Sequence, residues 1–567
     1  MTRSSLKKHD SAVESRALKA RRDRVTTQVR KDKRRQAVQT KRRRLMSSDE
    51  VPLTGRDIAE LVQILSDTSS ASIDSHQERF DVLREIRVML STHEHDYDAV
   101  EKIIESGIVP IMVNLLNSAS PLASATRTGG EVYREILWCL TNIASGQYEH
   151  TKLVLPAVPR LLQFLEGSNA TLAEHAAWVL GNIAADCEEF RQQLIANGAV
   201  LPLVKQLANP AAEKDLAKNC AWALSNIARG HETSAKAFID AGIIPALSVG
   251  LQLQANGNAH AFTEEIVIEV AWLLSFLTAR EEQYLKLLLE SGLVQLLLPY
   301  FTTANELLLT PLLRVFGNIC CGSADHHTDE WQMPYVHALL SADSPFLPKL
   351  HEFLQPNVAA SHAHLASESA WVLSNLAALD AKVVEVLLQA QFLPLLGTQF
   401  HDGSFEVRRE VAFALTNIAL TSQAHLEQVL ALDVLKGFLQ YLNAADVAIV
   451  GNSLRFIENV LRVAPRGVHL VELNEGIDAL ESVQFQSGEE HLSKWAAVLV
   501  NEFYGESYGV NSPPSVAAVG GFVPNLSVLQ PPVEGFSFGA THSPQQQQQQ
   551  PGGRGRGAHM TTPAWKK

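Results

Sequence analysis

The sequence predicts an all-helical protein: a right-handed superhelical solenoid of about ten repeats, with a basic arm before it and a low-complexity tail after it. A block built on tryptophan and asparagine recurs every 40 to 57 residues. The chain is 46% apolar but only 7% aromatic, so small aliphatic side chains must form the core, which suits packed helices better than sheets. Its 567 residues also exceed what one compact core holds, whereas stacked repeats can extend.

Seven blocks define the repeat, among them "HAAWVLGNIAAD" (175–186) and "NCAWALSNIARG" (219–230). In each block one key position, usually tryptophan, stands four residues before a position that is usually asparagine. The residues at this key position are Trp138, Trp178, Trp222, Trp272, Arg314, Trp371 and Phe413. A period of about 40–47 residues is typical of armadillo and HEAT repeats. The 57-residue interval before Trp371 indicates an insertion, which we place at 326–345.

A glycine marks a break inside several repeats. In "IIESGIVPIM" (103–112) and its equivalents, one helix is expected to end at Gly107, Gly198 or Gly242. The next helix should begin near Pro110, Pro202 or Pro245. Each repeat therefore holds two or three helices.

Composition divides the chain into an arm (1–45), a linker with a first helical segment (46–78), the armadillo solenoid (79–505) and a tail (506–567). The arm carries 17 Lys+Arg against 4 Asp+Glu, and the remainder 31 against 57. Such asymmetry favours cationic ligands for the body. The tail contains 8 Pro, 9 Gly and a glutamine run, which predicts disorder.

Several classes of protein are not expected. No apolar run approaches the roughly 20 residues of a membrane span, and the charged N-terminus is unlike a secretory signal. The five cysteines form no spaced framework, so we expect buried thiols in an intracellular protein, with no metal site. No phosphate loop or nucleophile–base pair is present, so we predict no enzyme activity, no catalytic residue and no cofactor.

Tryptophan and asparagine four residues apart share one helix face. Asparagine is unfavourable inside helices, so its recurrence requires either a bond between repeats or a ligand. We favour the ligand, because amides pair with the backbone of an extended peptide, while indole faces hold lysine stems and attract their ammonium groups. Acidic side chains would then fix the cation. The acidic candidates are Asp186, Glu269, Glu368 and Glu410.

This array, together with the basic arm, resembles importin-alpha, the adaptor of nuclear import, over about residues 15–505. The resemblance implies two cargo sites for lysine-rich nuclear localisation signals. The major site comprises Trp138, Asn142, Ser145, Thr151, Trp178, Asn182, Asp186, Trp222 and Asn226. The minor site comprises Arg314, Asn318, Glu368, Trp371, Asn375, Glu410, Phe413 and Asn417. Phe413, Cys321 and Phe276 depart from the family pattern.

The arm resembles the importin-beta-binding segment of that family. Its basic residues there are Arg21, Arg22, Arg24, Arg30, Lys31, Lys33, Arg34 and Arg35. The cluster Lys41, Arg42, Arg43 and Arg44 matches the autoinhibitory motif that occupies the major site when no importin-beta is bound. The resemblance also implies an export receptor for recycling, and shuttling between cytoplasm and nucleus.

Two other functions stay open at this point. A beta-catenin-like armadillo scaffold would present a basic groove rather than an acidic one. An RNA-binding adaptor would use the arm and the Arg-Gly stretch of the tail, with binding that falls steeply with salt. We expect no direct nucleic-acid binding and no membrane partner.

Overall fold

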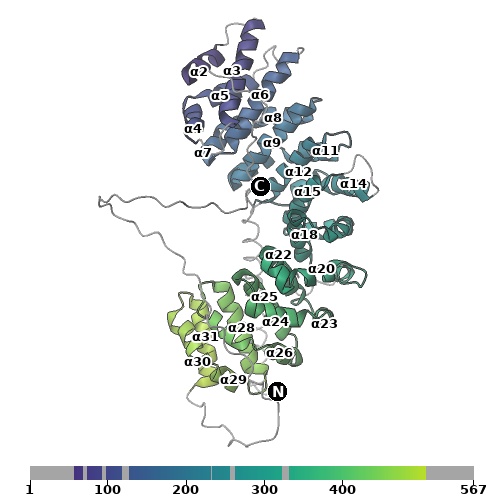
Figure 1. Cartoon of the computed structure of the whole chain (residues 1–567), viewed down its shortest axis with the longest axis vertical. Coiled ribbons are helices and arrows are strands. Elements are labelled where there is room, and N and C mark those ends of the chain that lie inside the picture. Colours follow the sequence, from purple (N-terminus) through teal and green to yellow (C-terminus); the bar gives the residue numbers. More distant parts are fainter. Residues whose placement is uncertain are drawn as a thin grey trace, which may run out of the picture. The chain divides into compact units, whose positions relative to one another are not determined.

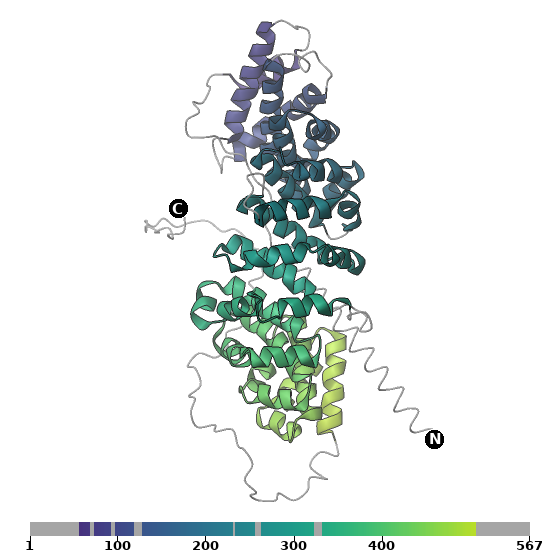
Figure 2. The same ribbon diagram turned by 90° about the vertical axis from the view of Figure 1, so that its right-hand side faces the viewer.

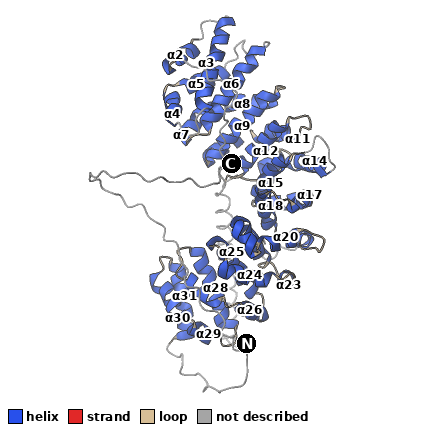
Figure 3. Cartoon of the chain, viewed as in Figure 1, coloured by secondary structure: helices blue, strands red, loops and turns tan. Residues whose placement is uncertain are grey.

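The computed structural model describes residues 56–67, 73–91, 97–117, 127–230, 233–255, 262–321 and 331–505. Every regular element within these ranges is helical (Figure 3). All of them belong to one compact unit that ends at Asn511. The prediction of an all-helical repeat fold is confirmed.

Long helices form the spine of this unit. In the described ranges they are α3 (Ile73–Ser91), α6 (Arg127–Ala144), α9 (Ala170–Asp186), α12 (Lys214–Ala228), α15 (Glu264–Leu277), α18 (Glu306–Ile319), α22 (Ala363–Leu376), α25 (Phe405–Ala419), α28 (Val447–Val463) and α31 (Glu490–Tyr504). Each packs on the next, and from α3 to α25 they succeed one another from top to bottom in Figure 1, while Figure 2 shows the last helix beside its neighbours. Ten long helices in the described chain agree with the expectation of about ten repeats.

A middle helix packs against most of the long helices. This set is α2 (Ile58–Ser66), α5 (Ile108–Asn117), α8 (Val158–Glu166), α11 (Val200–Ala208), α14 (Ile243–Ala255), α17 (Leu293–Leu297) with η3 (Leu298–Thr302), α20 (Phe346–Phe353), α24 (Phe392–Asp402), α27 (Leu435–Tyr441) and α30 (Gly476–Gln486). Because α2 and α3 pack on α5 and α6, the stack already includes residues before the predicted boundary at 79.

A short helix opens most repeats. These are α4 (Tyr97–Glu105), α7 (Tyr148–Val154) with η2 (Leu155–Ala157), α10 (Glu188–Ala196), α13 (Lys236–Asp240), α16 (Glu282–Glu290), α19 (Met333–Leu339), α23 (Ala381–Gln389), α26 (Gln423–Leu430) and α29 (Gly467–Leu473). The additional helix α21 (Pro356–Ser361) lies between α20 and α22. The predicted insertion at 326–345 thus contains α19, whereas 322–330 lies outside the described residues.

Side chains at the N-termini fix where the long helices begin. The Asn169 side chain accepts a hydrogen bond from the backbone N–H of Leu172 at 3.1 Å, and Asp446 accepts one from Ala448 at 2.9 Å. Ser404 caps α25 in the same way. Such caps satisfy backbone N–H groups that have no partner inside the helix.

The break between the short and middle helices uses the left-handed backbone region. Gly107, Gly198 and Gly242 have φ of 77°, 77° and 81°, as the sequence predicts. Glycine adopts this region without the steric clash that other residues meet. In later repeats the equivalent positions are Gln391 and Asp433, with φ of 61° and 58°.

Candidate functional site

The recurring tryptophan and asparagine positions form what we call the ladder. Its six asparagines lie on α6, α9, α12, α18, α22 and α25, and each donates a hydrogen bond to the long helix before its own. The Nδ2 atoms of Asn182, Asn226, Asn318, Asn375 and Asn417 donate to the carbonyls of Thr141 (2.9 Å), Gly181 (3.1 Å), Ser275 (2.9 Å), Gly317 (2.9 Å) and Ser374 (2.7 Å). Asn142 donates to the Leu90 carbonyl at 3.3 Å and to Ser91 Oγ at 3.0 Å. The inter-repeat bond, which sequence analysis left open, is present at all six positions. These bonds use the amide nitrogen.

We call the aromatic position of each block, together with the position four residues later, a rung of the ladder. At three rungs the aromatic ring contacts an arginine of the same chain. The guanidinium carbon of Arg87 lies 4.6 Å from the Trp138 ring centroid, and that of Arg314 lies 5.1 Å from the Trp272 ring. Arg409 lies 5.6 Å from the Phe413 ring. These separations are within the range of cation–π attraction. Positively charged groups thus lie on the faces of these three rings.

The predicted major-site residues Ser145, Thr151 and Asp186 lie close to the C-terminal ends of α6 and α9. Thr151 Oγ1 donates to Asp186 Oδ2 at 2.7 Å. Ser145 Oγ donates to the Asn142 carbonyl at 2.7 Å. The structure thus links the Asp186 carboxylate to the short helix α7, and it ties Ser145 to the rung of Asn142.

The carboxylates of the later repeats are engaged in ion pairs. Glu368 Oε1 lies 2.9 Å from Arg314 Nη2, and both side chains are largely buried. Glu410 Oε1 lies 2.7 Å from Arg409 Nη1, and Arg409 also contacts Asp446 at 2.9 Å. Sequence analysis placed Arg314, Glu368 and Glu410 in one site but did not anticipate that Glu368 pairs with Arg314 and Glu410 with Arg409. These pairs reduce the net negative charge that the minor site presents.

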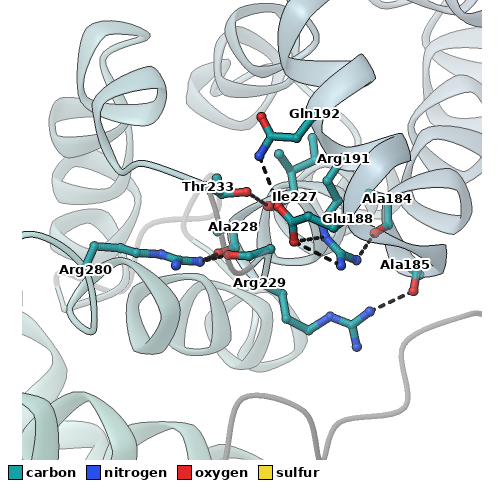
Figure 4. Close-up of polar contacts among 11 residues, drawn as sticks. Ala184, Ala185, Glu188, Arg191, Gln192, Ile227, Ala228, Arg229, Thr233 and Arg280 are labelled. Carbon is teal, nitrogen blue, oxygen red and sulfur yellow. Dashed lines mark hydrogen bonds and ion pairs between the residues drawn. The ribbon is translucent and has the colours of Figure 1, made fainter. Parts of the chain in front are cut away.

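Three further arginines cap the ladder helices, and sequence analysis did not single them out (Figure 4). Arg191 Nη1 donates to the Ala184 carbonyl at 2.9 Å, and Arg229 Nη2 donates to the Ala185 carbonyl at 2.7 Å. Arg280 donates to the carbonyls of Ala228 and Gly230. Cations at a helix C-terminus offset the negative end of its dipole. Burial, together with the charge of Arg191, lowers the pKa of Arg229 to about 10.

A positional signal for two of these arginines does exist in the sequence. Arg229 follows Trp222 by seven residues and Arg280 follows Trp272 by eight, close to the spacing of Asp186 after Trp178. Aligning the blocks therefore shows which long helices end at an acidic residue, such as Asp186, and which end at a basic residue, such as Arg229.

The described part of the chain contains cysteines, histidines, carboxylates and apolar helices. Within it, no group of three His, Cys, Asp or Glu residues is arranged to hold a metal ion. The cysteines form no disulfide, and burial raises the pKa of Cys139, Cys220 and Cys320. No single described helix is long and apolar enough to cross a membrane; two bent pairs, α16 with α17–η3 and α23 with α24, reach that length and apolarity only together.

The predicted arm residues, from Arg21 to Arg35, and the cluster Lys41–Arg44 lie outside the described residues, as does the tail 506–567. Their roles therefore stay predictions.

Comparison with known proteins decides the family. A model of the armadillo/beta-catenin-like repeat matches residues 150–185 and 187–229. Importin subunit alpha-9 of Arabidopsis thaliana is 32% identical over 484 residues, which cover 82% of this chain and 88% of that protein. The chain belongs to the importin-alpha family. Importin-alpha proteins are nuclear import adaptors rather than enzymes.

Other members of the importin-alpha family match at similar coverage. Importin subunit alpha-2 of Oryza sativa subsp. japonica is 29% identical over 77% of this chain and 80% of its own length. Among solved structures, an engineered protein from a structural genomics consortium superposes over 79% of this chain and 99% of its own. Its TM-score of 0.63 at 22% identity supports the fold alone.

Proposed function

We propose that this importin-alpha protein binds lysine-rich nuclear localisation signals along the row of tryptophans and asparagines on its long helices. The observation that carries the proposal is the repeated rung, in which an aromatic ring and an asparagine anchored to the preceding helix recur at the same places. Cargo and importin-beta are the general partners of the family.

Charge and geometry favour an extended basic peptide as the ligand. The Arg87 and Arg314 guanidinium groups on Trp138 and Trp272 are internal examples of the contact that a cargo lysine would make. Outside the arm the chain carries 57 acidic against 31 basic residues, which attracts such a peptide over a distance. In the proposed slots, lysine stems pack between rings and ammonium groups approach acidic side chains such as Asp186.

Fluorescence-anisotropy titration with a labelled monopartite signal peptide tests this site. Asp186→Lys, or Trp178→Ala combined with Asn182→Ala, should weaken binding at least tenfold, about 1.4 kcal/mol. Glu166→Lys is the matched control, because it makes the same charge change at an exposed position on α8. Circular dichroism must show that each variant is folded. Unchanged affinity in folded variants would mean that the ladder is purely structural.

The two grooves should differ in strength. Phe413 offers a smaller ring than tryptophan, and the neighbouring Glu410 is already paired with Arg409. A monopartite peptide should therefore prefer the groove of Trp138, Trp178 and Trp222, while Phe413→Trp should strengthen the other groove selectively. A structure with limiting peptide that shows occupancy only over α18, α22 and α25 would contradict this ranking.

The arm has two proposed roles. Residues 16–40 fold on importin-beta, and Lys41–Arg44 competes with cargo for the major site. A tethered segment meets its groove at an effective concentration of up to about millimolar, so modest intrinsic affinity suffices for autoinhibition. Because one segment serves both events, cargo and importin-beta must favour each other's binding.

Deletion tests these roles separately. Removing residues 1–45 should tighten signal-peptide binding and abolish importin-beta binding. Lys41→Ala with Arg42→Ala should tighten cargo binding and leave importin-beta binding largely intact. If arm deletion leaves cargo affinity unchanged at physiological salt, the arm serves only for docking.

Such an adaptor shuttles between cytoplasm and nucleus and returns with an export receptor. A fluorescent fusion followed after export is blocked tests this: nuclear accumulation supports shuttling, and an unchanged distribution contradicts it.

A further inference from the structure

Two glycines lie within helices that carry ladder asparagines. Gly181 lies inside α9 and Gly317 lies in the last turn of α18, each one residue before a ladder asparagine. Glycine weakens a helix interior, because it loses more conformational freedom on folding than any other residue. Its presence at these two positions therefore needs a local cause.

The next rung supplies that cause. A Cβ atom on Gly181 would stand 2.4 Å from Cζ3 and 2.6 Å from Cε3 of Trp222. On Gly317 it would stand 2.2 Å from Cζ3 of Trp371. Carbon atoms in contact are normally about 3.5–4.0 Å apart. The six-membered part of each indole thus lies directly against the backbone of the preceding helix, where only a hydrogen atom fits.

The same glycines also hold the asparagines of the next rung. The Gly181 carbonyl accepts from Asn226 Nδ2 at 3.1 Å, and the Gly317 carbonyl accepts from Asn375 Nδ2 at 2.9 Å. Each glycine therefore contacts both members of one Trp–Asn rung. A change at the glycine would move both side chains together.

How deeply a tryptophan ring is buried depends on whether a glycine lies opposite it on the preceding long helix. Trp222 and Trp371 are only 2% and 1% exposed. Trp178 and Trp272 are half-buried, and the positions equivalent to the glycines in the helices before them are Thr141 and Ser225.

We propose that Gly181 and Gly317 are positioning residues for cargo recognition, one in each groove, that set how deeply Trp222 and Trp371 sit. A deep ring lets the methylene stem of a lysine lie beside it, whereas a raised ring closes the slot. This inference rests on the proposed function, because it assigns the glycines to the grooves that bind the signal peptide.

The test uses the full chain and a labelled lysine-rich monopartite peptide. Gly181→Ala should weaken peptide binding about tenfold and shift the ¹⁹F resonance of Trp222 in protein labelled with 5-fluorotryptophan, assigned by its loss in Trp222→Phe. Gly451→Ala is the matched control. It also lies inside a long helix, α28, but its Cβ would meet Leu492 Cδ2 at an ordinary 3.6 Å. It should change neither reading.

A double variant separates positioning from general destabilisation. Phenylalanine lacks the outer indole atoms that contact Gly181, so Gly181→Ala in the Trp222→Phe background should cost no further affinity. This background also relieves the clash if Gly181→Ala alone fails to fold. Additive losses, or wild-type affinity in folded Gly181→Ala, would overturn the positioning role while leaving cargo binding in place. Failure of the wild-type chain to bind the peptide would overturn the proposed function and this inference with it.

Discussion

Replacing Asn226 gives the sharpest test of the inter-repeat bonds. Asn226 is 1% exposed, and its Nδ2 donates to the Gly181 carbonyl at 3.1 Å. Because Gly181 lies inside α9, its carbonyl keeps a helical partner when the asparagine is lost. Asn226→Ala should therefore remove one net hydrogen bond and leave a small cavity, together about 1–2 kcal/mol.

Asn226→Asp should be worse than Asn226→Ala, although it preserves the shape. A carboxylate cannot donate, so it would place a buried negative charge against a carbonyl oxygen, at a cost of roughly 3 kcal/mol or more. Asn197→Asp is the control. Its amide also donates to a helix carbonyl, that of Gln193 at 2.7 Å, but it is exposed, so the loss should be about 1 kcal/mol or less.

The assay is hydrogen exchange of α12 amides, read by mass spectrometry, which reports the free energy of opening that helix. We expect the order wild type, Ala, Asp in decreasing protection. An aspartate variant that is protected better than the alanine variant would refute the donor role of Asn226.

Three further outcomes follow from the structure. Gln391 is a non-glycine residue in the left-handed region, with φ of 61°, so Gln391→Gly should raise the free energy of unfolding in urea by roughly 0.5 kcal/mol. Gly198→Ala, at φ of 77°, should lower it by about 1 kcal/mol. If both variants changed stability in the same direction, the strain argument would be wrong. Glu135→Gln removes the carboxylate that lies 2.5 Å from the buried Arg87 guanidinium. The free energy of opening α6, measured by hydrogen exchange, should fall by about 3 kcal/mol. A loss below about 1 kcal/mol would show that the pair is dispensable. Burial raises the pKa of Tyr441 to about 12 from an ordinary value of 10, so between these pH values the unfolded state loses its proton first and stability falls. Tyr441→Phe should remove a loss on the order of 1 kcal/mol between pH 9 and 11, measured by urea midpoints, and an identical pH dependence in both proteins would refute it.

Local pattern was sufficient to predict much of the fold. The recurring blocks place the long helices, and Gly107, Gly198 and Gly242 do adopt the left-handed conformation at the predicted breaks. Gln391 carries no such signal, because a non-glycine residue in that conformation is held there by its surroundings rather than by its own preference.

The candidate site was predictable only in part. Periodicity places the asparagines on one face, but it cannot distinguish a bond to a neighbouring helix from a bond to a ligand, since both require the same spacing. The structure shows the first at Asn226 and its equivalents, and the second stays a prediction. The contact of Arg87 with Trp138 joins residues 51 positions apart, and no local spacing encodes it.

The additional helix α21 has a consequence for how such a chain can change over time. It lies within the interval of 57 residues between key positions, yet Asn375 reaches the Gly317 carbonyl at 2.9 Å, the same distance at which Asn182 reaches that of Thr141 across a 40-residue interval. Rung spacing is thus set by helix-on-helix contact and is independent of the length of chain between rungs. Connecting segments can lengthen, shorten or acquire new binding elements during evolution while the register read by an extended ligand stays constant.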